Sequence, residues 1–244
     1  MALTLNLEKS AATLKLCLEK AGVTKLPELE LAFILDVSGS FEDEHRKGIT
    51  NDLLTRLVPW GLTFDPDRKL DVITFSDGEH SVQAVGAVNA DNYSGFVARE
   101  IIDQVKGWNG GTDYSYALEQ ALRDFGWMAG KQPGLFGRLM GRKAEVRERK
   151  RSLVIMVTDG DNFDKDRTMS VLRSSEQRGD AIYFLFLGVS NQGSKFPFLE
   201  KIGDAFNNTG YVGIKNLRSF VQKSDEELND SLLTGELKNW LKAA

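Results

Sequence analysis

Residues 29–40 read LELAFILDVSGS, an apolar run that ends directly in an aspartate and two serines. The near-continuous apolar character of residues 29–35 predicts a short strand that is covered on both faces, as in a parallel sheet between two layers of helices. Three later segments have the same character. The four predicted buried strands are residues 29–35, 70–75, 153–157 and 181–187.

Helix-like segments separate these strands, with apolar residues recurring at helical spacing. The predicted helices are residues 45–58, 114–125 and 167–178. Two weaker strands, 81–85 and 211–214, bring the expected sheet to six strands; the first follows an Asp77-Gly78 hairpin signal. Alternation of strand and helix predicts a doubly wound, mostly parallel α/β sheet with helices on both faces, which is a Rossmann-like arrangement.

The remaining segments extend this domain at both ends. Residues 1–28 are expected to form an N-terminal extension whose amphipathic helix packs on a domain of residues 29–215. Residues 216–244 are expected to form a C-terminal helical segment, with one closing helix over 216–241 that can break at Gly235. A basic insertion, residues 131–151, holds eight Lys or Arg against two Glu.

Composition excludes several classes of protein. The chain has 244 residues, a formal net charge of −4 and a pI near 5.4, which do not suit a dedicated nucleic-acid-binding protein. A single cysteine, Cys17, cannot form an internal disulfide. Charged residues interrupt the N-terminal 22 residues, and no apolar run approaches 18 residues, so we expect neither a signal peptide nor a transmembrane segment. A cytoplasmic protein fits these features.

Three loops carry the polar residues that can do chemistry. Asp36-Val37-Ser38-Gly39-Ser40 follows the first strand, Gly-Gly-Thr-Asp (110–113) precedes a helix, and Thr-Asp-Gly-Asp (158–161) follows a later strand. A parallel arrangement brings all three to one edge of the sheet. Oxygen ligands without imidazole or thiolate suit Mg²⁺ or Mn²⁺ better than zinc. Helix capping can explain each loop separately, but it does not explain why three occur together.

The Asp-x-Ser-x-Ser, Gly-Gly-Thr-Asp and Thr-Asp-Gly combination resembles the von Willebrand factor A (vWA) domain and its metal-ion-dependent adhesion site (MIDAS). The resemblance implies that Ser38 and Ser40 coordinate a metal through their hydroxyls. It also implies that Thr112, Asp36 and Asp159 bind the metal directly or through water. The open position of the ion would then accept an Asp or Glu from a protein partner, in a non-enzymatic interaction module.

The resemblance covers about residues 29–215, and within the family the chain is most similar to bacterial and phage vWA proteins associated with tellurium resistance. This similarity implies that the protein acts in the cytoplasm, in tellurium resistance or stress response. Two aromatic residues adjoin the metal loops, Phe41 and Trp108, and either could supply an apolar contact around the partner's carboxylate.

An enzymatic alternative is a Mg²⁺-dependent phosphatase similar to the haloacid dehalogenases, with Asp36 as nucleophile. Such enzymes normally need a second carboxylate two residues further on, where this chain has Ser38, and they have no counterpart of the Gly-Gly-Thr loop. Both histidines, His45 and His80, lie in charged or turn-like sequence and are expected to be solvated.

The basic insertion supports a separate hypothesis of partner binding at the opposite edge of the sheet. Its apolar residues and its positive charge suit an acidic protein, nucleic acid or an anionic membrane. A solvated loop explains the same composition. The residues chosen as candidate contacts are Arg147, Arg149, Lys150 and Arg151.

Overall fold

The structure is a computed structural model that describes residues 5–130, 148–190 and 195–243. Its strands are β1 (Glu30–Asp36), β2 (Leu70–Phe75), β3 (Gln83–Val88), β4 (Ser152–Thr158), β5 (Ile182–Val189) and β6 (Thr209–Ile214). They form one six-stranded sheet in the order β3-β2-β1-β4-β5-β6. Neighbouring strands are parallel except for β2 and β3, which form the predicted antiparallel hairpin.

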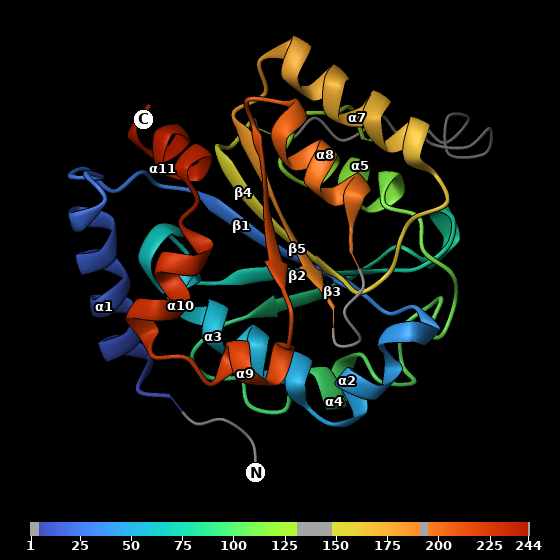
Figure 1. The fold of residues 1–244 in the computed structure, drawn as a ribbon, viewed down its shortest axis with the longest axis horizontal. Coiled ribbons are helices and arrows are strands. Elements are labelled where there is room, and N and C mark those ends of the chain that lie inside the picture. Colours follow the sequence, from blue (N-terminus) through green and yellow to red (C-terminus); the bar gives the residue numbers. More distant parts are fainter. Residues whose placement is uncertain (1–4, 131–147, 191–194, 244) are drawn as a thin grey trace, which may run out of the picture.

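Helices cover both faces of this sheet (Figure 1). They are α1 (Leu7–Lys20), α2 (Glu42–Arg46), α3 (Ile49–Phe64), α4 (Phe96–Glu100), α5 (Ser115–Asp124), α7 (Lys165–Arg178), α8 (Pro197–Ala205), α9 (Leu217–Val221), α10 (Asp225–Leu232) and α11 (Gly235–Lys242), with 3-10 turns η1 (Gly39–Phe41) and η2 (Glu79–Ser81). The layer of α5, α7 and α8 covers one face, and α3, α10 and α11 lie on the other. Helix α1 packs outside this second layer, against α3 and α10.

The central strands are buried as the sequence predicts. Every residue of β1, β4 and β5 is buried, because side chains on both faces of these strands enter an apolar core. Each fully buried aliphatic or aromatic side chain contributes roughly 1.5–3 kcal/mol. The predicted mostly parallel α/β fold with helices on both faces is therefore confirmed.

The helix predicted over residues 45–58 is in fact two helices, α2 and α3. The break lies at Gly48, whose φ of +75° is a left-handed conformation that glycine adopts without steric cost. The polar start of α2, from Glu42, has too few apolar residues to show helical spacing. The apolar pattern therefore located α3 and missed the turn before it.

The closing helix predicted over residues 216–241 is in fact three helices, α9, α10 and α11; the break allowed at Gly235 matches the start of α11, but the break between α9 and α10 was not predicted. Ser224 caps α10 in a reciprocal pair of hydrogen bonds with Glu227. The hydroxyl of Thr234 accepts the backbone N–H of Leu237 and so caps α11, which begins at Gly235. Short caps of this kind end one helix and start another without interrupting the apolar pattern.

Candidate functional site

The candidate site lies where β1 and β4 end side by side. Leu35 pairs with Val157 in the parallel register, so Asp36 and Thr158 leave the sheet at the same edge. Asp36 is fully buried. Its Oδ1 accepts the backbone N–H of Ser38 at 2.8 Å, and its Oδ2 accepts the hydroxyl of Thr158 at 2.5 Å. One carboxylate thus fixes its own loop and ties that loop to β4.

Four of the predicted site residues converge directly beside Asp36. The Ser40 hydroxyl donates to Oδ1 of Asp159 at 2.7 Å, and the Oγ atoms of Ser38 and Ser40 lie 3.2 Å apart. A methyl group placed on Gly160 would lie 3.3 Å from Oγ1 of Thr112 and 3.8 Å from Oγ of Ser40. The hydroxyls of two loops and the Asp159 carboxylate of the third therefore face one small space.

Backbone contacts between loops explain why Thr112 lies there. Ser38 and Gly110 form an isolated parallel bridge, in which the N–H of Gly39 donates to the carbonyl of Gly110 at 3.1 Å. The N–H of Asn109 donates to the carbonyl of Val37 at 2.9 Å. The loop before α5 therefore continues the sheet beyond the end of β1.

The loop after β4 braces the start of α5 from the other side. Asp164 accepts the backbone N–H groups of Tyr114 at 3.0 Å and Ser115 at 2.9 Å. The N–H of Phe163 donates to the carbonyl of Thr112 at 3.0 Å. Sequence analysis missed Asp164, although an aspartate shortly after the Thr-Asp-Gly-Asp motif is a recognisable capping residue.

The electrostatics of the site favour a bound cation. Burial raises the pKa of Asp36 to about 7, against the opposing hydrogen bonds from Thr158 and Ser38. Burial likewise raises the pKa of Asp159 to about 6. Among the described residues, no Lys or Arg forms an ion pair with either carboxylate. Two desolvated acids without a basic partner are destabilised when they ionise.

The donor set fits a hard divalent ion. Hydroxyl and carboxylate oxygens, without nitrogen or sulfur, are the ligands that Mg²⁺ and Mn²⁺ prefer. In the part of the chain that the structure describes, no three carboxylate, imidazole or thiol groups form a metal-binding cluster. The candidate ligands include only two carboxylates and are otherwise hydroxyls. The suitability of this site for a metal ion therefore rests on the geometry of Ser38, Ser40 and Thr112.

The expectation that His45 is solvated is wrong, because its ring is buried beneath the site. Its Nε2 lies 2.9 Å from the carbonyl oxygen of Asp36, and its Nδ1 lies 2.9 Å from the hydroxyl of Thr50. Burial lowers the pKa of His45 to about 4, so the ring is neutral near pH 7. His45, in α2, thus connects the end of β1 to Thr50 at the start of α3. His80, in contrast, is exposed as predicted.

Two aromatic residues named as candidate partner contacts differ in their exposure. Phe41 is fully buried against His45, so the expectation that its ring touches a partner is wrong. Trp108 is half-buried and packs between His45 and the guanidinium of Arg46. Among the described residues, the aromatic side chain that does face solvent is Phe163, which is 83% exposed and was not selected from the sequence.

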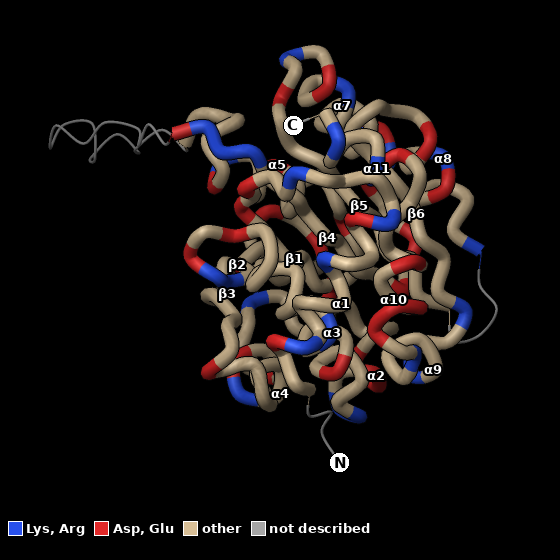
Figure 2. Tube along the Cα trace, turned by 90° about the vertical axis from the view of Figure 1, so that its left-hand side faces the viewer, with Lys and Arg blue, Asp and Glu red and all other residues tan. Residues whose placement is uncertain are grey.

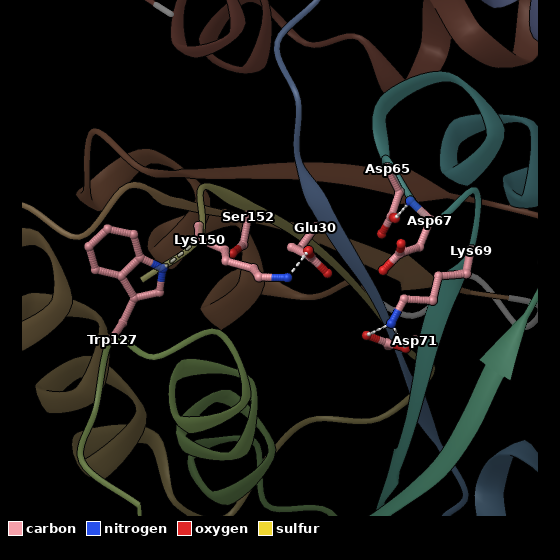
Figure 3. Close-up of polar contacts among 8 residues, drawn as sticks. All are labelled: Glu30, Asp65, Asp67, Lys69, Asp71, Trp127, Lys150 and Ser152. Atoms are coloured by element: carbon pink, nitrogen blue, oxygen red, sulfur yellow. Dashed lines mark hydrogen bonds and ion pairs between the residues drawn. The ribbon is translucent and has the colours of Figure 1, made fainter. Parts of the chain in front are cut away.

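The described part of the basic insertion leads into β4, at the opposite edge of the sheet from Asp36. Its three basic residues appear as a blue run beside α5 in Figure 2. Lys150 pairs with Glu30 at 2.5 Å (Figure 3), and Arg151 stacks on the ring of Trp240 at 4.2 Å. Arg149 lies 5.7 Å from the centre of the Trp127 ring. These side chains therefore make intramolecular contacts.

Arg147, the fourth basic candidate, lies outside the described residues, as does the rest of 131–147. Within the described ranges, no helix is both long enough and apolar enough to span a membrane.

Comparison with known proteins places this geometry in a family. Residues 28–244 match the model vWA-TerF-like, described as the vWA domain found in the C terminus of TerF. The uncharacterized protein YcbR of Bacillus subtilis (strain 168) is 25% identical over 246 residues, which cover 99% of this chain and 88% of YcbR.

Two solved structures share the fold. The N-terminal domain of TFIIH p34 aligns with a TM-score of 0.51 and 15% identity, over 81% of this chain and 95% of that domain. The pilus adhesin SpaC from Lactobacillus rhamnosus GG aligns with a TM-score of 0.52 and 12% identity, over 86% of this chain. This chain spans only 31% of SpaC. At these identities the likeness concerns the fold alone.

Proposed function

Because this chain belongs to the vWA-TerF-like family, we propose that it is a non-enzymatic protein-interaction module that depends on a divalent metal ion. Asp36, Ser38, Ser40, Thr112 and Asp159 would hold Mg²⁺ or Mn²⁺ as a MIDAS. A bound ion would neutralise the two carboxylates and offer an open position to the carboxylate of an Asp or Glu from a partner protein.

The observation that carries this proposal is the convergence of three hydroxyls, from two separate loops, with the half-buried Asp159 of a third loop and the buried Asp36. Ser40 bonds to Asp159, Ser38 lies next to Ser40, and Thr112 and Ser40 both border the open side of Gly160. Helix capping does not account for this arrangement, because Asp164 caps α5 and neither Ser38 nor Phe41 provides a side-chain cap for the elements they precede. The hydroxyl oxygens of Ser38, Ser40 and Thr112 are thus left available for a common ligand, whereas Asp36, whose two oxygens already accept hydrogen bonds, would act through water.

The phosphatase alternative receives less support from the same contacts. A nucleophilic carboxylate needs an oxygen directed toward its substrate. Asp36 is fully buried, and its two oxygens accept hydrogen bonds from Ser38 and Thr158. The position where such an enzyme would carry its acid is Ser38. We therefore propose binding rather than catalysis at this site.

The cellular process in which the protein would act is proposed from its family alone. A domain of the TerF type suggests work in tellurium resistance or stress response, in the cytoplasm and beside other proteins of that system. The basic insertion would be a second contact, for an acidic protein, nucleic acid or an anionic membrane. Arg149, Lys150 and Arg151 would have to exchange their present intramolecular contacts for it.

Metal binding can be tested by calorimetry with Mg²⁺ and by the electron paramagnetic resonance signal of Mn²⁺. We expect the parent chain to bind one ion and Asp159→Ala to lose most of its affinity. Asp161→Ala is the matched control, because Asp161 lies two residues further on and pairs with Lys165 at 2.5 Å. Saturation at about 100 times Kd should stabilise the parent by about 2.7 kcal/mol, or about 5–10 °C in Tm. Equal responses of the two variants would reject the site.

A further inference from the structure

Phe163 is presented to solvent beside the candidate metal site. Among the described residues, two large apolar side chains are exposed, Phe163 at 83% and Leu16 at 56%. A single exposed apolar residue is ordinary on a protein surface and by itself indicates nothing. Leu16 lies on the outer helix α1, whereas Phe163 is bonded through its backbone to Thr112. Phe163 therefore differs from Leu16 in lying beside the candidate metal site.

The backbone around Phe163 is held on both sides. Its N–H donates to the carbonyl of Thr112, and the next residue, Asp164, accepts the first N–H groups of α5. The preceding residue, Asn162, is buried and donates to Asp164 at 2.7 Å and to Thr168 at 3.1 Å. The exposed ring is therefore carried by an ordered loop, so that a partner would meet a pre-organised contact.

Glycines separate this ring from the hydroxyls of the site. A methyl group on Gly111 would lie 3.4 Å from Cε2 of Phe163, and one on Gly160 would lie 3.3 Å from Oγ1 of Thr112. Without side chains at these two positions, a partner backbone can approach the hydroxyls and the ring together. The ring is thus close enough for neighbouring residues of one segment to reach both.

Acidic groups at the rim restrict which partner segment fits. Asp77 also borders Gly111 and accepts its N–H at 3.3 Å, and Asp161, which follows Asp159 in the same loop, pairs with Lys165 at 2.5 Å. Additional carboxylates on the partner would meet Asp77, which forms no ion pair among the described residues, and be repelled. A suitable segment therefore carries a single acidic residue with an apolar neighbour, rather than an acidic run.

We propose that Phe163 is the apolar anchor of the partner interface, and that it packs against an aliphatic or aromatic side chain adjacent to the partner's metal-binding Asp or Glu. This inference rests on the proposed function and adds the chemistry of the partner segment to it. Aromatic residues, phenylalanine included, are enriched at protein interfaces, and a few buried residues carry most of the binding energy there.

Three blocked tripeptides test the proposal with the full chain in saturating Mg²⁺: acetyl-Leu-Asp-Gly-amide, acetyl-Gly-Asp-Leu-amide and acetyl-Gly-Asp-Gly-amide. Affinities are measured by NMR titration. We expect the better leucine peptide to bind about five-fold tighter than the glycine peptide, because it buries part of an aliphatic side chain. Phe163→Ala should abolish that preference and leave the affinity for the glycine peptide unchanged. Phe163→Leu should keep most of the preference.

Leu16→Ala is the control for loss of an exposed apolar side chain elsewhere, and it should bind all three peptides as the parent does. A leucine preference that survives in Phe163→Ala, or is missing from the parent, overturns the role of Phe163 alone. If Mg²⁺ binds but none of the peptides binds in its presence, the proposed carboxylate recognition fails and this inference fails with it. Mg²⁺ affinity, measured separately, distinguishes that result from loss of the metal site.

Discussion

Asp164 connects two of the three loops at the site, and its removal should weaken both the fold and the site. Its carboxylate accepts the N–H groups of Tyr114 and Ser115, the side-chain amide of Asn162 at 2.7 Å and the hydroxyl of Thr168 at 3.1 Å. Asp164→Ala removes the acceptor of all four hydrogen bonds at once. The first turn of α5, immediately after Thr112, would lose its cap.

The magnitude follows from these contacts. Loss of an N-terminal cap costs about 0.5–2 kcal/mol. Buried donors without a partner, here on Asn162 and Thr168, cost about 1–3 kcal/mol. Because the groups share one network, the two terms overlap, and we expect a total loss of about 2–4 kcal/mol in the free energy of unfolding. This is a large part of the 5–15 kcal/mol typical of a folded domain.

Urea unfolding at pH 7 measures this loss, with Asp166→Ala as the control because Asp166 is an exposed acid in the same turn of α7. The control should change stability by less than about 0.5 kcal/mol. Burial alone would raise the pKa of Asp164, but hydrogen bonds from Ser115, Asn162 and Tyr114 lower it. The stability that its ionised form contributes is therefore present above the ordinary carboxyl pKa near 4 and is lost as the pH falls further. Equal stability of Asp164→Ala and Asp166→Ala at pH 7 would refute this account of the loop.

Three further predictions concern the stability of the fold. His45→Ala should cost about 3 kcal/mol in urea unfolding, because it opens a cavity and leaves the Asp36 carbonyl without its partner; a loss below 1 kcal/mol would contradict this. Gly61→Ala places a methyl group 2.5 Å from the carbonyl oxygen of Lys69 and should cost about 3 kcal/mol, whereas Gly235→Ala meets nothing within 4 Å and should change Tm little. Burial raises the pKa of Asp65 to about 6, so its folded state binds the proton more tightly and stability should fall by about 1.4 kcal/mol from pH 5 to pH 8. Asp65→Asn (Figure 3) should remove that part of the pH dependence in parallel urea titrations, and an unchanged pH profile would assign it to other acids.

The sheet could be predicted from the sequence because buried parallel strands have a strong local signature. Residues 70–75 were predicted with the observed bounds, and the other buried strands differ by one or two residues at their ends. The helix breaks were harder, since Gly48 and Thr234 act through backbone geometry and caps that leave the apolar pattern continuous.

The candidate site could be assembled from motifs because the ends of parallel strands share one edge. The burial of the side chains around the site could not be predicted in this way, because it depends on which side of a loop faces the core. Phe41 directly follows the motif serine, and yet its ring is buried. Phe163 is a large apolar residue, and yet its ring is exposed. His45, in a charged segment, is buried through two hydrogen bonds that no local pattern reveals. Such orientations are set by tertiary contacts, which spacing alone does not encode.

The composition of the proposed ligand set links metal binding to partner binding. Asp36 and Asp159 contribute a formal charge of −2 when both are ionised, and the hydroxyls of Ser38, Ser40 and Thr112 contribute none. A divalent ion would leave this set neutral, so a partner carboxylate could approach without repulsion from the ligands themselves. Further acidic ligands would hold the ion more tightly but would repel the partner.

Neutral hydroxyls bind a metal ion weakly, so the affinity of the site depends on how accurately they are positioned. Their positions depend on the bridge between Ser38 and Gly110 and on the hydrogen bonds that Asp164 accepts from the start of α5. Substitutions in these supports should therefore lower metal affinity without removing a single ligand.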